Sequence, residues 1–157
     1  MRAIEFTYGS KDVQDFMSLY TEDRLNLEPG FQRQSVWSLN DRKKLILSIL
    51  QNYPVPSVFL YKTVDERGRL KFDVLDGKQR LESILMFAGL GKFRRDKYEI
   101  KTSLNNEDDP DYWDWNSLKK YGHEHRITGY RIQTVEVSGE LSDIIDLFVR
   151  INSTGKR

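Results

Sequence analysis

The stretch Leu70–Leu90, LKFDVLDGKQRLESILMFAGL, decides the fold because the spacing of its apolar residues changes once along its length. Leu70, Phe72 and Val74 alternate with polar residues, which is the period of a half-buried strand. From Leu81 onward, apolar residues recur at the i, i+3, i+4 and i+7 positions of an amphipathic helix. The sequence therefore predicts a strand that is followed directly by a helix.

The segment DGKQR lies between this strand and this helix. We expect Asp76 to cap the helix and Gly77 to allow the sharp turn that precedes it. A helix that begins here directs its free N–H groups and the positive end of its dipole toward the end of the strand. Lys78, Gln79 and Arg80 add donors and two positive charges, so the turn is suited to bind phosphate. An ordinary strand-to-helix turn with exposed polar residues explains the same pattern equally well.

The composition indicates one globular domain with a polar surface, since 38% of the 157 residues are hydrophobic and 31% are charged. The net charge of +1 argues neither for nor against a nucleic-acid partner, so such binding needs a local patch. The absence of cysteine excludes disulfides, thiolate zinc sites and cysteine nucleophiles. No apolar run approaches the roughly 18–20 residues that span a bilayer, so we expect a cytoplasmic protein with no membrane partner.

The N-terminal third predicts one strand and two helices. Ala3–Thr7 has a strand-like pattern, and Ser10 is placed to cap the first helix. Ser38 and Asp41 have the spacing of a capping box, and the helix that they begin is expected to end near Asn52.

The remaining chain adds strands on both sides of a charged segment. Val58–Tyr61 is a second strand, and the turn that follows predicts an antiparallel hairpin with Leu70–Leu75. We expect the charged segment at about 92–128 to be an insertion of loops and short helices. Arg131–Val137 is the last strand, and an amphipathic helix follows it. These elements predict an α+β fold, with a small mixed β-sheet flanked by helices.

Two basic clusters are candidates for contact with the phosphates of DNA. Arg42, Lys43 and Lys44 lie in the first turn of the second helix, and Arg94 and Arg95 lie in the charged segment. Solvated surface charge explains both clusters as well.

Two further motifs place polar residues among apolar ones. The segment FQRQSVW holds Arg33 inside an aromatic frame, where it could contact phosphate or carboxylate, or pack over Trp37 with its guanidinium in solvent. The segment FVRINSTG, near the C-terminus, holds Arg150 and Asn152 at the end of the last helix.

The three motifs FQRQSVW, DGKQR and FVRINSTG, in this order, resemble the N-terminal domain family of GmrSD-type, modification-dependent restriction systems. That family has a ParB-like and sulfiredoxin-like fold and a DGQQR signature. The resemblance is close over Leu27–Leu90 and extends to Val135–Gly155. Lys78 replaces the first glutamine of the signature, which keeps a donor, loses an acceptor and adds charge.

The resemblance implies that the chain binds a nucleotide and, as in several members, hydrolyses a nucleoside triphosphate. The residues that would bind the nucleotide are Arg33, Gly77, Lys78, Gln79, Arg80, Arg150 and Asn152, and all of them except Lys78 match the family's motifs. Hydrolysis needs cations on the phosphates, usually a metal, and a group that positions water. Asp76 and Arg80 are the catalytic candidates, and Asp76 is the candidate ligand of Mg²⁺. Arg150 and Asn152 would close the pocket if the last helix lay beside the central one.

The resemblance also implies partners and a role in defence against phage DNA. The expected partners are modified DNA and a nuclease of the HNH type, either as a further domain of a longer protein or as a separate chain. Three functions stay open: an NTP-hydrolysing regulatory domain that gates a nuclease, a non-enzymatic DNA-binding sensor, and a ParB-like nuclease. If Asp76 only caps the helix, the domain binds nucleotide without cleaving it.

Overall fold

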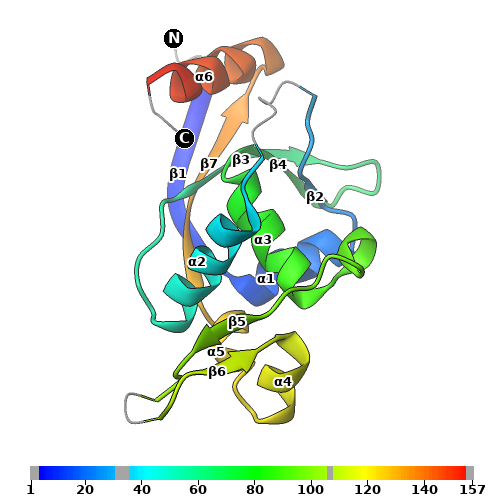
Figure 1. The fold of residues 1–157 in the computed structure, drawn as a ribbon. Coiled ribbons are helices and arrows are strands. Elements are labelled where there is room, and N and C mark those ends of the chain that lie inside the picture. The colour runs from blue at the N-terminus through cyan, green and yellow to red at the C-terminus, as the bar shows by residue number, and fades with distance from the viewer. Residues whose placement is uncertain (1–3, 31–35, 106–107, 155–157) are drawn as a thin grey trace.

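The computed structural model describes residues 4–30, 36–105 and 108–154 and contains a five-stranded mixed sheet (Figure 1). The strand order is β1-β7-β3-β4-β2. Strand β3 runs parallel to β7 and antiparallel to β4. The strands of this sheet are β1 (Ile4–Asp12), β2 (Leu25–Asn26), β3 (Val58–Val64), β4 (Leu70–Asp76) and β7 (Arg131–Gly139). The predicted α+β fold with a mixed sheet is confirmed, and so is the β3–β4 hairpin.

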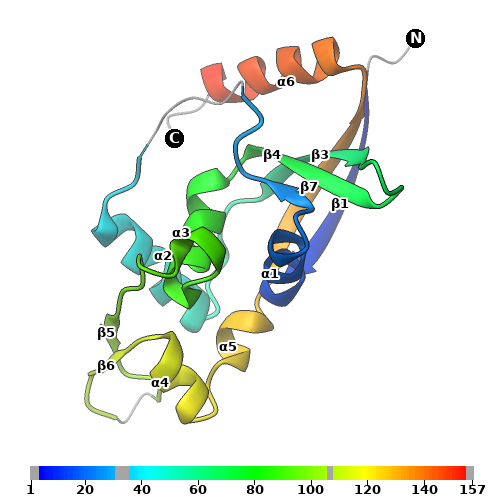
Figure 2. The ribbon, with the colours of Figure 1, turned by 90° about the vertical axis from the view of Figure 1, so that its right-hand side faces the viewer.

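Helices pack on both faces of the sheet. The described helices of the whole domain are α1 (Val13–Thr21), α2 (Leu39–Leu50), α3 (Lys78–Ala88), α4 (Trp115–Lys120), α5 (His125–Thr128) and α6 (Leu141–Thr154). In Figure 2, α6 and α3 lie on either side of strands β3 and β4. No helix within the described residues has the length and apolar character needed to cross a membrane.

Each face of the sheet has its own apolar core. On one face, Val58, Leu60 and Val74 pack with the buried residues of α1, α2 and α3 in the larger core. On the other face, Leu75 and the alternate β7 residues pack with α6 in a smaller core. Successive residues of a strand point to opposite faces, so the same strands supply both cores.

The first helix is capped two residues later than Ser10. Strand β1 continues to Asp12, whose Oδ1 accepts a hydrogen bond from the backbone N–H of Asp15 at 2.7 Å. The strand is longer than predicted because all of its residues pair with β7, which lies near the other end of the chain. The capping box of Ser38 and Asp41 is confirmed, with reciprocal hydrogen bonds of 3.1 and 3.0 Å at the start of α2.

The charged segment 92–128 contains more regular structure than loops and short helices. A two-stranded ribbon forms from β5 (Ile100–Thr102) and β6 (Asp111–Trp113), and a short 3₁₀ helix covers Gly91–Phe93. Side chains from this segment, such as Ile100 and Leu118, are buried in the larger core. The segment therefore packs against the helical layer, at the end of the molecule opposite α6 (Figure 1).

The packing of α6 on the sheet predicts that alanine substitutions at two neighbouring residues change the free energy of unfolding by very different amounts. Phe148 is 4% exposed in the smaller core, and Val149 beside it is 57% exposed. We expect Phe148→Ala to lower the free energy of unfolding by about 3–5 kcal/mol, since it leaves a cavity. Val149→Ala should change it by less than about 0.5 kcal/mol. Urea unfolding of both variants measures the difference, and equal losses would mean that α6 does not pack as described.

Candidate functional site

The turn between β4 and α3 depends on glycine. Gly77 is the N-cap residue of α3 and has a φ of +103°, in the region that L-residues rarely adopt. A Cβ atom at this position would lie 2.9 Å from Cγ2 of Val58 and 3.2 Å from Nη2 of Arg80. The expectation that Asp76 caps this helix is therefore wrong. Asp76 ends strand β4, where it pairs with Phe59.

A buried arginine joins α2 to the first turns of α3. Arg42 is 7% exposed, and its Nη1 donates to the backbone oxygen of Gln79 at 3.2 Å and to Oγ of Ser83 at 3.0 Å. Its Nη2 donates to Oε1 of Gln79 at 2.9 Å. Arg42 thus lies between the two helices, and not on an exposed basic face as expected. Helical spacing could have indicated this burial, because Arg42 precedes the buried Leu45 and Ile46 by three and four residues and so lies on the same face of α2.

The residues of DGKQR hold both ends of the segment that contains FQRQSVW. Before that motif, Oε1 of Glu28 lies 3.3 Å from Nζ of Lys78. At its end, the backbone N–H of Trp37 donates to Oε1 of Gln79 at 3.3 Å. The first two motifs therefore meet at the start of α3, although Arg33 itself lies outside the described residues. Lys78 makes one of these two contacts.

An open groove of about 600 Å³ lies between α2, the link of residues 54–56 and the first turn of α3. Arg80 of DGKQR and Lys44 of α2 both line it, together with Trp37 and Asp41. Arg80 is held in place because its Nη2 donates to the backbone oxygen of Ser57 at 2.8 Å. The full lining is Val36, Trp37, Asp41, Lys44, Leu45, Ser48, Pro54, Val55, Pro56 and Arg80.

The groove carries two cations against one carboxylate in its described lining. Hydrogen bonds from the backbone and side chain of Ser38 hold the pKa of Asp41 below its usual value, so this carboxylate is ionised at neutral pH. Lys44 is exposed, whereas Lys43 beside it is half-buried. Sequence analysis missed the groove, although Asp41, Lys44 and Ser48 have the i, i+3, i+7 spacing of a single helix face.

The third motif does not lie beside the central helix. Helix α6 packs on the sheet face opposite α3, so the expectation that it flanks α3 is wrong. The exposed Arg150 forms an ion pair with Asp146 of the same helix at 3.3 Å. Asn152 belongs to α6, and its side chain lies outside the described residues. The predicted DNA contacts Arg94 and Arg95 are exposed, just after the 3₁₀ helix.

A metal ion at this site would have few protein ligands. In the described parts of the chain, no three His, Asp or Glu side chains gather where they could hold a metal. Asp76, at the end of β4, remains the carboxylate nearest in sequence to the turn. A single carboxylate would be enough for Mg²⁺ only where phosphates and water supplied its other ligands.

The fold and the site define an α+β domain with a polar groove at the first turn of the helix that follows a central hairpin. In a comparison with known families, residues 13–157 match the family described as GmrSD restriction endonuclease, N-terminal domain. The chain belongs to this family, and its context is therefore a restriction system that acts on DNA. No curated protein and no solved structure matched the chain.

Because Gly77 is crowded, we expect its replacement by alanine to lower the free energy of unfolding by more than backbone strain alone would. Gly77→Ala forces a Cβ against Val58, whereas Gly68→Ala, at a φ of +79°, meets nothing within 4 Å. A strained φ costs about 1–3 kcal/mol at either position, and the contact with Val58 adds about 1 kcal/mol or more at the first. Chemical denaturation of both variants tests this. A loss at Gly77 no greater than that at Gly68 would contradict the described turn.

A half-buried glutamate on α3 predicts a pH-dependent effect. Burial raises the pKa of Glu82, although Lys78 and Arg42 nearby act to lower it. The folded carboxyl therefore holds its proton more tightly than the unfolded one, so stability falls as the pH rises through the raised pKa. We expect Glu82→Gln to melt at a higher temperature than wild type at pH 7, with the gap closing below the ordinary pKa of 4.5. Melting curves from pH 4 to pH 8 measure the gap, with Glu99→Gln, at an exposed site, as the control. A gap that does not change with pH would refute this account.

Proposed function

We propose that this domain binds a nucleoside triphosphate in the groove between α2 and α3 and hydrolyses it to control a DNA nuclease. The observation that carries the proposal is the pairing of Lys44 and Arg80, which come from different elements and line one groove. A volume of about 600 Å³ is within the range of small-molecule sites.

The lining suits the two parts of a nucleotide. Arg80 offers a planar guanidinium and Lys44 a mobile ammonium, and both bind phosphate oxygens well. Trp37 offers an aromatic surface on which a base can stack. Gln79 and Lys78 support the site, since they fasten the last residue of FQRQSVW, Trp37, and the preceding Glu28 to α3. Arg33, inside that segment, would add a further cation to the phosphates.

Hydrolysis would require a carboxylate near the phosphates, and Asp76 is our candidate. It belongs to the strand that leads into the turn and is partly buried. Mg²⁺, when bound, would neutralise charge on the phosphates, with Asp76 as its protein ligand. Asp76 would otherwise orient the attacking water, which requires its ionised form.

The DNA partner and the nuclease follow from the family context. We propose that modified DNA is sensed in the same complex and that cleavage is carried out by a nuclease of the HNH type. Arg94 and Arg95 are exposed on the surface of the 92–128 segment, where they could contact the DNA backbone. Arg42 has no part in this contact, because it is buried.

Nucleotide binding predicts a thermal shift that depends on one lysine. At a nucleotide concentration 100 times the Kd, we expect wild type to gain about 2.7 kcal/mol in stability with Mg²⁺ present. Lys44→Glu should remove most of this gain, since it replaces a groove cation by an anion. Lys43→Glu, one residue earlier on α2, is the matched control and should keep the gain. The site is refuted if no NTP raises the melting temperature of wild type, or if both variants show equal shifts.

If Asp76 takes part in hydrolysis, its replacement should slow turnover without preventing nucleotide binding. We expect Asp76→Asn to keep the nucleotide-dependent thermal shift and to lower the rate of phosphate release by at least about 100-fold, since a general base or metal ligand contributes about this much. Release of inorganic phosphate under saturating NTP measures the rate. Undiminished release from this variant would remove Asp76 from the mechanism and leave the binding site intact.

A further inference from the structure

In the part of the chain that the structure describes, strand β1 forms one edge of the sheet. All nine of its residues pair with β7 in an unbroken register, from Ile4 with Gly139 to Asp12 with Arg131. β1 is the terminal strand in the order of the sheet, so its other edge pairs with no strand among residues 4–30, 36–105 and 108–154. Residues 5–9 are exposed, and residues 4–10 contain neither Pro nor Lys, which commonly protect such edges.

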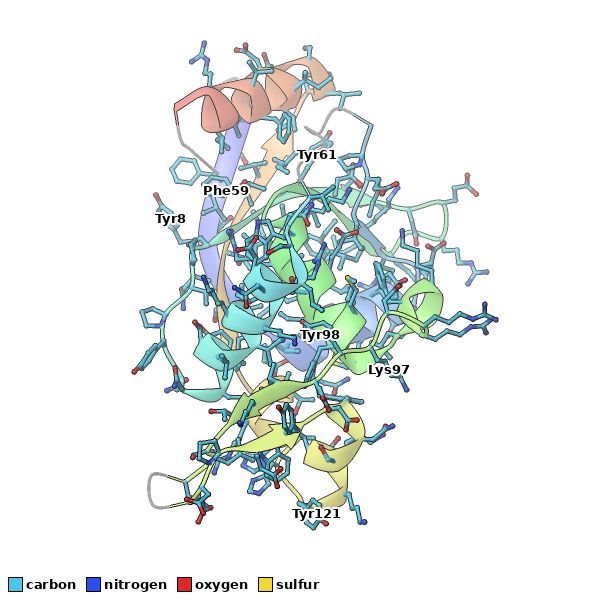
Figure 3. The ribbon with its side chains drawn as sticks, in the orientation of Figure 1. Tyr8, Phe59, Tyr61, Lys97, Tyr98 and Tyr121 are labelled. Atoms are coloured by element: carbon cyan, nitrogen blue, oxygen red, sulfur yellow. The ribbon has the colours of Figure 1, made fainter. Side chains whose placement is uncertain are left out.

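Two aromatic side chains extend the apolar surface of this edge. Phe6 is 59% exposed and Tyr8 is 78% exposed, and their ring centroids are 5.5 Å apart. They pair with Val137 and Val135, which belong to the smaller core under α6, so both rings lie on the α6 side of the sheet. Figure 3 shows Tyr8 at the outer edge of the sheet.

We propose that two copies of this chain pair through β1, antiparallel and in register about Thr7, to form one continuous sheet. In this register, Phe6 of each copy faces Tyr8 of the other, on the same side of the sheet. Aromatic pairs directly across antiparallel strands are among the stabilising pairs of β-sheets. The strand is therefore complementary to itself, which favours a second copy over an unrelated partner.

The charges of the strand agree with this register. Glu5 is the one charged residue between positions 4 and 10, and it faces Gly9 of the other copy, which has no side chain. Lys11 of the other copy lies diagonal to Glu5 on the same face, so opposite charges approach and like charges do not. Lys11 already contacts Glu136 at 3.5 Å in its own copy, which keeps it on that face.

The pairing also places the aromatic rings between two helices. A two-fold axis perpendicular to the sheet keeps the two α6 helices on one side, with the four aromatic rings between them. The surface left exposed beside α6 in a single copy is then enclosed. This inference does not depend on the proposed nucleotide site, because the groove lies on the other face of the sheet.

Sedimentation of the full chain over a range of protein concentrations tests the pairing. We expect a reversible dimer, and we expect Phe6→Lys and Tyr8→Lys each to raise its dissociation constant at least tenfold. The matched control is Tyr112→Lys, at a tyrosine that is 57% exposed on the β5–β6 ribbon, and it should leave the dimer unchanged. A monomer at every concentration would overturn the proposal, and so would a dimer that all three variants keep.

Because the chain has no cysteine, a single introduced thiol gives a second test of the register. Thr7→Cys places two thiols opposite each other at the two-fold axis, within the reach of a disulfide. We expect mild oxidation to convert most of this variant to a covalent dimer, while Ser142→Cys, exposed on α6, stays monomeric on a non-reducing gel. Cross-linking no faster at Thr7 than at Ser142 would overturn the register.

Discussion

The side chain of Arg42 holds together the two helices that form the groove. Its guanidinium is buried, and three acceptors on Gln79 and Ser83 take its hydrogen bonds. A buried cation is costly when its donors lack partners, so α2 cannot slide along α3 without a large loss of free energy. Gln79 passes this constraint on to Trp37 through one further hydrogen bond. The shape of the groove therefore depends on a residue that does not line it.

The sheet separates two kinds of surface. Its larger core supports α2, α3 and the polar groove, whereas its smaller core holds α6. The 92–128 segment buries Tyr98 against α3, where the phenol donates to the backbone oxygen of Ser83 at 2.7 Å (Figure 3). Burial raises the pKa of this phenol far above its usual value, so it remains a donor at any physiological pH.

Local patterns in the sequence predicted much of the fold. The change of period after Asp76 and the capping box at Ser38 each depend on residues a few positions apart, and both are seen. Properties that depend on distant segments could not be predicted in the same way. The burial of Arg42 depends on Gln79, and the face chosen by α6 depends on which side of the sheet the earlier helices cover. The groove itself needs Lys44 and Arg80, which no local pattern connects.

The pairing of β1 with β7 has a consequence for synthesis of the chain. The paired residues are between about 120 and 135 positions apart, so β1 leaves the ribosome long before its neighbour exists. At rates of about 5–20 residues per second, the delay is roughly 6 to 27 seconds. During this time the segment that contains Phe6 and Tyr8 has both edges unpaired. Chaperones that shield extended apolar segments would have their main opportunity to bind this chain in that interval.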